Sequence, residues 1–69
     1  MKIKLNGNDT DTSAASLSDL VSEFVAEKGV DTTALIAEYN YRVIKQEAWP
    51  DTRLGDGDVV ELLSFVGGG

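Results

Sequence analysis

The sequence predicts an α+β domain in which a single helix covers one face of one mixed sheet of four to five strands. Three observations predict it: strand-like apolar patterns at both ends of the chain, one apolar stripe at helical spacing between them, and turn-forming residues at the junctions. Sixty-nine residues are enough for one domain with a small core.

A β-hairpin is predicted at the start of the chain. Residues 1–5 alternate between apolar and lysine side chains, which is typical of a half-buried strand. Asn6-Gly7 follows, the strongest short signal for a hairpin turn. The return strand lies somewhere in Asp9–Ala15, and its polar, weakly patterned sequence favours the edge of the sheet.

One helix is predicted over about residues 17–28. The Ser16 hydroxyl can accept a hydrogen bond from the free amides of the first turn, and Asp19 stands at the capping-box position. Gly29 can adopt the left-handed conformation that ends a helix. The apolar stripe of this helix consists of Leu17, Leu20, Val21, Phe24 and Val25.

A second strand pair is predicted after the helix. Ala34–Tyr39 has the composition of a strand, Asn40-Tyr41 that of a turn, and Arg42–Ile44 that of a short return strand. The segment Lys45–Leu54 has no clear period. Its single tryptophan, Trp49, is expected to pack at the core or its edge rather than to bind a ligand.

The last strand is predicted over Val59–Val66, after a turn cluster at Gly55–Asp58. Because its strand signal is the longest in the chain, we expect this strand at the centre of the sheet, beside the first strand. The order hairpin, helix, strand pair, irregular stretch, final strand is the β-grasp (ubiquitin-like) arrangement. The predicted domain covers residues 1–66, followed by a flexible glycine tail at 67–69.

Alternation divides the side chains of the last strand between two faces. Val60 and Leu62 share one face and are expected to meet the helix, whereas the other face carries Leu63 and Phe65, with Glu61. With only one helix available, the second face is open to solvent unless the segment around Trp49 folds over it. An apolar cluster on an open face predicts a docking surface for a protein partner.

The composition favours a binding or carrier module over an enzyme. A domain of this size has little core to spare for an internal substrate cleft. The chain has no histidine and no cysteine, so the usual general base, the best nucleophile and the commonest zinc ligands are all missing. The turn at Gly55–Asp58 lacks the remaining ligands of an EF-hand, which favours a turn over a calcium site.

The charge and hydropathy of the chain limit which classes of partner and which cellular compartment we expect for it. A formal net charge of −6 disfavours nucleic acid and favours a protein with a positive patch, although acidity also serves solubility. The alternation at residues 1–5 leaves no room for a signal peptide, and no segment approaches the ~20 apolar residues of a membrane helix. These features predict a cytoplasmic protein that binds neither nucleic acid nor a membrane.

The sequence ends in three glycines, Gly67, Gly68 and Gly69. A terminal carboxylate is ionised at neutral pH and can attack an activated phosphate. Four extended residues reach roughly 13–14 Å, and glycine fits a narrow channel because it has no Cβ. The glycines alone leave two interpretations equally open: a reactive end that enters another protein's active site, or a tail without a function.

Several stretches together resemble the ThiS family, the ubiquitin-like sulfur carriers of thiamin biosynthesis. They are Asn6-Gly7, Ser16–Leu20, Asn40, Trp49, Leu54–Glu61 and Gly68-Gly69, and the resemblance extends from Met1 to Gly69. Two departures stand out. Asn40-Tyr41 occupies a turn that often reads Asn-Gly in the family, and a tyrosine with positive φ would be strained, which allows for a different turn. The extra Gly67 lengthens the flexible part.

The resemblance implies a carrier that is a co-substrate of other enzymes and holds no cofactor or metal of its own. A ThiF-like enzyme would use ATP to adenylate the carboxylate of Gly69. Sulfur derived from cysteine would then displace AMP and leave a thiocarboxylate, whose sulfur a ThiG-like thiazole synthase would accept. Gly68 belongs to the same reactive end, and the expected partner-binding residues are Leu63, Phe65, Val66 and Gly67.

Other functions of the same fold stay open at this point. The MoaD-like small subunit of molybdopterin synthase shares the fold, the tail and the activation, but its chains tend to be longer. The Asn6-Gly7 turn, Trp49 and the short spacing from helix to strand favour ThiS. A sulfur carrier of cysteine or methionine synthesis, a conjugating modifier and a plain protein-interaction module are further alternatives. The sequence leaves the sulfur acceptor and the oligomeric state open.

Overall fold

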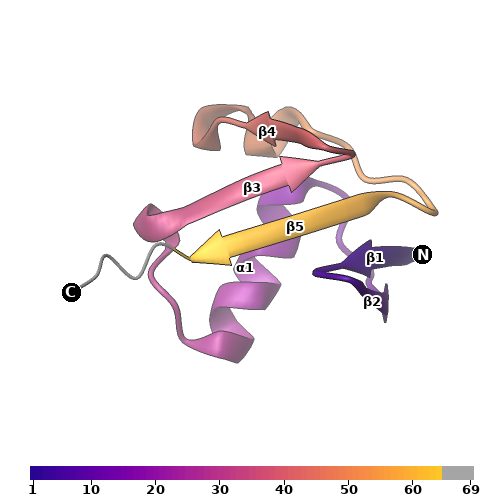
Figure 1. Cartoon of the computed structure of the whole chain (residues 1–69), viewed down its shortest axis with the longest axis horizontal. Coiled ribbons are helices and arrows are strands. Elements are labelled where there is room, and N and C mark those ends of the chain that lie inside the picture. The colour runs from indigo at the N-terminus through magenta and orange to yellow at the C-terminus, as the bar shows by residue number, and fades with distance from the viewer. Residues whose placement is uncertain (65–69) are drawn as a thin grey trace.

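The computed structural model describes residues 1–64 of the 69-residue chain. Five strands form one sheet in the order β2-β1-β5-β3-β4 (Figure 1). In chain order the elements are β1 (Lys2–Leu5), β2 (Asn8–Asp11), α1 (Leu17–Lys28), the 3₁₀ helix η1 (Thr32–Ala34), β3 (Leu35–Tyr39), β4 (Arg42–Ile44), the 3₁₀ helix η2 (Gln46–Asp51) and β5 (Val59–Ser64).

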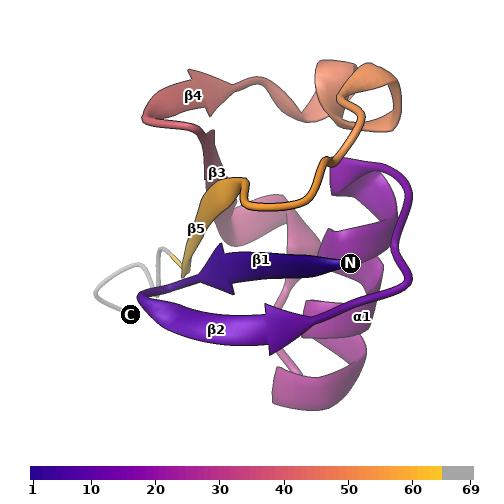
Figure 2. The same cartoon turned by 90° about the vertical axis from the view of Figure 1, so that its right-hand side faces the viewer.

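The sheet is mixed, with β5 at its centre. β1 runs parallel to β5, whereas the pairs β1–β2, β3–β4 and β3–β5 are antiparallel. Helix α1 packs across one face of the sheet and η2 lies on the same side of it (Figures 1 and 2). The predicted β-grasp fold is therefore confirmed, as are the edge position of β2 and the central position of β5 beside β1.

The local signals in the sequence place both ends of α1. The Ser16 hydroxyl accepts a hydrogen bond from the Asp19 amide at 3.1 Å. Gly29 ends the helix at a φ of 71°, where its amide donates to the Val25 carbonyl at 2.8 Å. Glycine adopts this left-handed conformation without the steric cost that a Cβ brings. The observed bounds of α1, Leu17–Lys28, are the predicted ones.

No helix among residues 1–64 is long and apolar enough to cross a membrane.

Both hairpins close through two residues with positive φ, the pattern of a type I′ turn. Asn6 and Gly7 have φ of 50° and 84°, and Asn40 and Tyr41 have φ of 50° and 71°. The sequence left a different turn open at Asn40-Tyr41, because a tyrosine with positive φ is strained. The structure shows the same type of turn there as at Asn6-Gly7. A type I′ turn matches the right-handed twist of the flanking strands. This match outweighs the steric cost of a tyrosine in the left-handed backbone conformation. Tyr41 itself is 79% exposed.

The core lies between α1 and the helix-facing side of the sheet. Its largest fully buried side chains are Ile3, Leu17, Leu20 and Val60. Leu62 is buried beside Val60 as predicted, whereas its neighbours Glu61 and Leu63 are exposed. The predicted division of β5 into two faces is thus confirmed for Val60–Leu63; Phe65 lies outside the described residues.

The segment around Trp49 belongs to the helix side of the sheet. Trp49 is 4% exposed within the core, and its indole Nε1–H donates to the Ile44 carbonyl at 2.9 Å. The prediction that this tryptophan packs rather than binds a ligand agrees with that placement. Because η2 lies on this side, it leaves the opposite face of the sheet uncovered (Figure 2).

Candidate functional site

The candidate site is the end of β5 together with the sheet face that α1 does not cover. β5 runs through the middle of the sheet and ends at Ser64, away from the N-terminus (Figure 1). Of the residues predicted to act or to bind partners, Leu63 lies on this strand. Phe65, Val66, Gly67, Gly68 and Gly69 lie outside the described residues.

A hydrogen-bonded turn holds the beginning of β5. The Asp58 carboxylate accepts hydrogen bonds from the Tyr39 hydroxyl at 2.7 Å, the Gly55 amide at 2.6 Å and the Asn40 amide group at 3.2 Å. Burial by itself would raise the pKa of Asp58, but these three donors outweigh it and hold the pKa below its usual value. The bond to Asp58, with burial, raises the pKa of the Tyr39 hydroxyl.

This network gives the Gly55–Asp58 turn a structural role. Both oxygens of Asp58 accept hydrogen bonds within the domain, and the Asp56 carboxylate accepts one from the Lys2 amide at 2.7 Å. Between residues 1 and 64, no group of three or more His, Cys, Asp or Glu side chains is placed to hold a metal ion. The predicted turn itself is confirmed, because the Asp58 amide donates to the Gly55 carbonyl at 3.1 Å.

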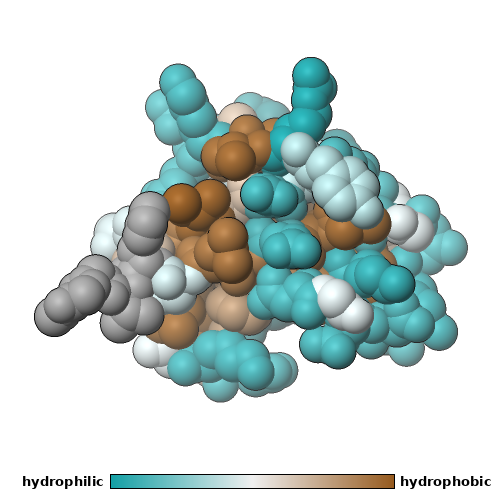
Figure 3. Space-filling view, in the orientation of Figure 1, coloured by the Kyte–Doolittle hydropathy of each residue, from teal (hydrophilic) through white to brown (hydrophobic). Residues whose placement is uncertain are grey.

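The uncovered face carries exposed or half-buried apolar side chains on β3, β4 and β5. Leu63 is 50% exposed and lies opposite Ile36 of β3, and Val43 of the edge strand β4 is 66% exposed. Strand alternation places Ile36 on this face, because its neighbours Leu35 and Ala37 are buried on the other. Figure 3 shows apolar side chains gathered on this face. We call Ile36, Val43 and Leu63 the apolar patch.

Two glutamates lie beside the apolar patch. Glu38 of β3 and Glu61 of β5 are directly opposite each other in the strand register, on the same face as Leu63. Like charges in such a pair repel each other, so a cation on a partner protein would be favoured there. Sequence reasoning placed Leu63 and Glu61 on this face but missed Ile36, Val43 and Glu38, because only the strand register brings them together.

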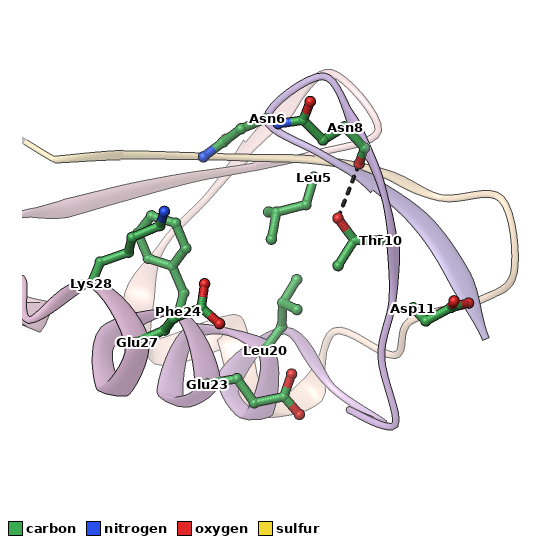
Figure 4. Close-up of a pocket in the computed structure, with 10 residues that line it drawn as sticks. All are labelled: Leu5, Asn6, Asn8, Thr10, Asp11, Leu20, Glu23, Phe24, Glu27 and Lys28. Atoms are coloured by element: carbon green, nitrogen blue, oxygen red, sulfur yellow. Dashed lines mark hydrogen bonds between the residues drawn. The ribbon is translucent and has the colours of Figure 1, made fainter.

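A hollow of about 270 Å³ lies on the opposite side of the sheet, between α1 and the β1–β2 hairpin (Figure 4). Leu5, Leu20 and Phe24 contribute apolar surface to it, and Glu23 and Glu27 of α1 are among its charged residues. Asn6 of the β1–β2 turn lines it, whereas no residue of the apolar patch does. The predicted site residue Leu63 does not line it.

The comparisons with known families and proteins agree with this geometry. The model of a family described as the ThiS family matches residues 3–69. The chain is 32% identical over 69 residues to the sulfur carrier protein ThiS of Bacillus subtilis (strain 168), a match that covers 97% of this chain and 98% of that protein. It is also 32% identical over 69 residues to a thiazole synthase of Paramagnetospirillum magneticum (strain ATCC 700264 / AMB-1). The chain spans 20% of the length of that relative.

Solved structures show the same fold. The crystal structure of the thiamine biosynthesis protein ThiS from Geobacter metallireducens superimposes with a TM-score of 0.79 at 33% identity, covering all of both chains. An NMR solution structure of a thiamine biosynthesis protein from the same organism gives a TM-score of 0.74 at 34% identity and covers 88% of that chain. The arrangement of one helix on a five-stranded sheet is thus common to this chain and both of these structures.

Proposed function

The chain belongs to the ThiS family, and from this premise we propose that it is a sulfur carrier for thiazole formation in thiamin biosynthesis. The observation that carries the proposal is the placement of β5. This central strand carries the exposed Leu63 of the apolar patch, and in the sequence the three terminal glycines follow it after Phe65 and Val66. The close match in length to the sulfur carrier of Bacillus subtilis supports it.

The proposed chemistry takes place at the carboxylate of Gly69. In the site of a ThiF-like enzyme, a carboxylate oxygen attacks the α-phosphorus of ATP, and pyrophosphate leaves. A sulfide equivalent derived from cysteine then forms a bond to the carbonyl carbon, and AMP leaves with the oxygen. The product is a terminal thiocarboxylate. The carrier is a co-substrate in both steps, and the partner enzymes supply ATP binding and the catalytic groups.

The proposed acceptor of the sulfur is a ThiG-like thiazole synthase. The similarity of this chain to part of a protein named thiazole synthase supports that acceptor. All of these partners are cytoplasmic in the proposal. In the proposal the domain comprises residues 1–66, and residues 67–69 enter the partner's active site, with Gly68 next to the reacting group.

The proposed docking surface combines the apolar patch with the residues that follow it. Leu63 offers half of its side-chain surface to a partner, and Glu38 and Glu61 beside it favour a basic side chain on that partner. Phe65, Val66 and Gly67 continue the proposed contact. Leu63 is the described residue of this set whose loss we expect to weaken binding most.

Conversion of the terminus is the direct test of the proposal. Incubation with ATP, the ThiF-like enzyme and a sulfur source should exchange one oxygen of the Gly69 carboxylate for sulfur, as measured by intact-mass spectrometry. Deletion of Gly69 should abolish the exchange. Deletion of Gly67, which keeps the Gly68-Gly69 end but removes one residue of the proposed contact, should slow the exchange without abolishing it. Circular dichroism should report the same fold for all three chains. If the complete chain gains no sulfur with its partners present, the proposal is wrong.

Growth rescue separates thiamin synthesis from the alternative pathways. The gene for this chain should restore growth without added thiazole in a strain that lacks its own thiamin sulfur carrier. The Gly69 deletion should fail to do so. Rescue of molybdenum-enzyme activity in a strain without a molybdopterin synthase small subunit, with no rescue of thiazole synthesis, would assign the chain to the MoaD-like function instead.

A further inference from the structure

The two sides of β5 are held by different partners. β3 pairs with β5 from Val60 through to Ser64, whereas the ladder of β1 reaches only Val59 and Val60. At Asn6 the chain leaves β1 and turns into the hairpin with a φ of 50°. The β1 side of the half of β5 that leads to residues 65–69 therefore depends on the turn that follows β1.

Asn6 extends the β1 ladder by one step through its side chain. Its amide N–H donates to the Val60 carbonyl at 2.9 Å, and its side-chain Oδ1 accepts from the Leu62 amide at 2.8 Å. In a parallel ladder, a residue that lies opposite position j of the next strand donates its amide N–H to the carbonyl of residue j−1. Its own carbonyl accepts from the amide N–H of residue j+1. Asn6 makes this same pair of bonds to β5. Its carboxamide oxygen stands in the place of the main-chain carbonyl, which the turn has rotated away.

This substitution makes specific demands on the residue at position 6. The residue must tolerate a positive φ, and its short side chain must carry an acceptor. Glycine meets only the first demand, and asparagine and aspartate meet both. Leu62, whose amide N–H donates this bond, is 3% exposed, so water would compensate that amide poorly if the acceptor were lost.

We propose that Asn6 is a positioning residue for the reactive end: its carboxamide holds the C-terminal half of β5 in register for the activating enzyme. This inference rests on the proposed sulfur-carrier function. Without the Asn6 acceptor, Leu62 joins the two residues after it in being held, among the described residues, by β3 alone, through the pairs Ala37↔Leu62, Ile36↔Leu63 and Leu35↔Ser64. The enzyme then has to order this half of the strand when it binds, which weakens binding without changing the chemistry at Gly69.

Asn40 supplies a matched control at the other end of the same strand. It also lies in a two-residue turn at a φ of 50°, and its Oδ1 accepts from the Val59 amide at 2.8 Å. Its amide N–H donates to the Val59 carbonyl at 2.7 Å. Both asparagines thus bond to β5 through an amide N–H and a side-chain oxygen, and Asn40 also donates from its side-chain amide to Asp58 at 3.2 Å. Asn40 acts on the first residue of the strand, and Asn6 acts on the half that leads to the proposed reactive end.

The experiment compares four chains: the natural sequence, Asn6→Gly, Asn6→Asp and Asn40→Gly. ATP-pyrophosphate exchange catalysed by the ThiF-like enzyme gives KM for the carrier and kcat. For Asn6→Gly we expect KM to rise about fivefold at unchanged kcat, the factor that one hydrogen bond typically contributes. Asn6→Asp should restore KM to within about twofold of the natural chain, because its carboxylate can accept from Leu62. Asn40→Gly should leave KM unchanged.

Hydrogen exchange measured by NMR tests the bond without the enzyme. The Leu62 amide should exchange on the order of tenfold faster in Asn6→Gly and at the natural rate in Asn40→Gly. An unchanged KM in Asn6→Gly, or an equal rise in Asn40→Gly, overturns the positioning role. If the natural chain supports no pyrophosphate exchange at all, the sulfur-carrier proposal itself fails, and the Leu62 exchange rates still decide whether Asn6 holds β5.

Discussion

Replacement of Trp49 by alanine is expected to remove most of the free energy of unfolding, a loss of about 3–5 kcal/mol. Trp49 is 4% exposed and packs into the core from η2. A domain of 69 residues has a total stability of only about 3–10 kcal/mol. The alanine leaves a cavity where the indole was, and it leaves the Ile44 carbonyl without the donor that now lies at 2.9 Å.

Trp49→Phe separates the two contributions. Phenylalanine keeps most of the ring volume but has no N–H, so we expect a loss of about 1–3 kcal/mol, the cost of an unsatisfied buried acceptor. Urea unfolding followed by far-ultraviolet circular dichroism is the suitable measurement, because both substitutions remove the only tryptophan fluorophore. If the free energy of unfolding of Trp49→Ala lies within about 1 kcal/mol of that of the natural chain, the substitution behaves like one at the surface. In that case η2 does not contribute to the core as described.

The second prediction contrasts two residues of β5 that point in opposite directions. Val60 is 0% exposed against α1 and Leu63 is 50% exposed on the uncovered face. Val60→Ala should lower the free energy of unfolding by roughly 1–3 kcal/mol through the cavity that it leaves. Leu63→Ala should lower it by less than about 0.5 kcal/mol, because half of that side chain already contacts solvent.

The same two variants should have opposite effects on binding. Leu63→Ala is expected to lower the affinity for the activating enzyme by about 1–2 kcal/mol, as the loss of an apolar anchor often does. Val60→Ala should bind with the natural affinity at temperatures where it is folded. Thermal melts and calorimetric titrations measure the two effects. Phe65→Ala, at a position outside the described residues, should behave like Leu63→Ala. Equal losses of melting temperature for Val60→Ala and Leu63→Ala would mean that the docking face has been misidentified.

The sequence predicts correctly those elements that form through interactions between residues close together in the chain. Ser16 and Gly29 mark the two ends of α1 because a cap needs only a side-chain acceptor or a left-handed residue at one position. Asn6-Gly7 predicts its hairpin for the same reason. The alternation from Val60 to Leu63 predicts which side chains of β5 face the helix, because the period of two belongs to any strand.

The irregular segment and the second turn needed the folded chain to be understood. The residues around Trp49 have no period, and they form the 3₁₀ helix η2 because the core accommodates the indole beside α1. Tyr41 adopts a φ of 71°, against its own preference, because the twist of β3 and β4 requires it. In both cases packing between distant parts of the chain outweighs local preference.

The sequence by itself determined the fold class, the helix with its caps, the central final strand and the glycine end that led to the proposed carboxylate chemistry. Only the tertiary structure decided what surrounds the strand that carries this end. Ile36 and Val43 join Leu63 through the register of three strands, and Asn6 reaches Leu62 across 56 positions of sequence. The physical reason is that strand register and side-chain to main-chain hydrogen bonds depend on which segments the core brings together, and no local pattern of residues records that choice.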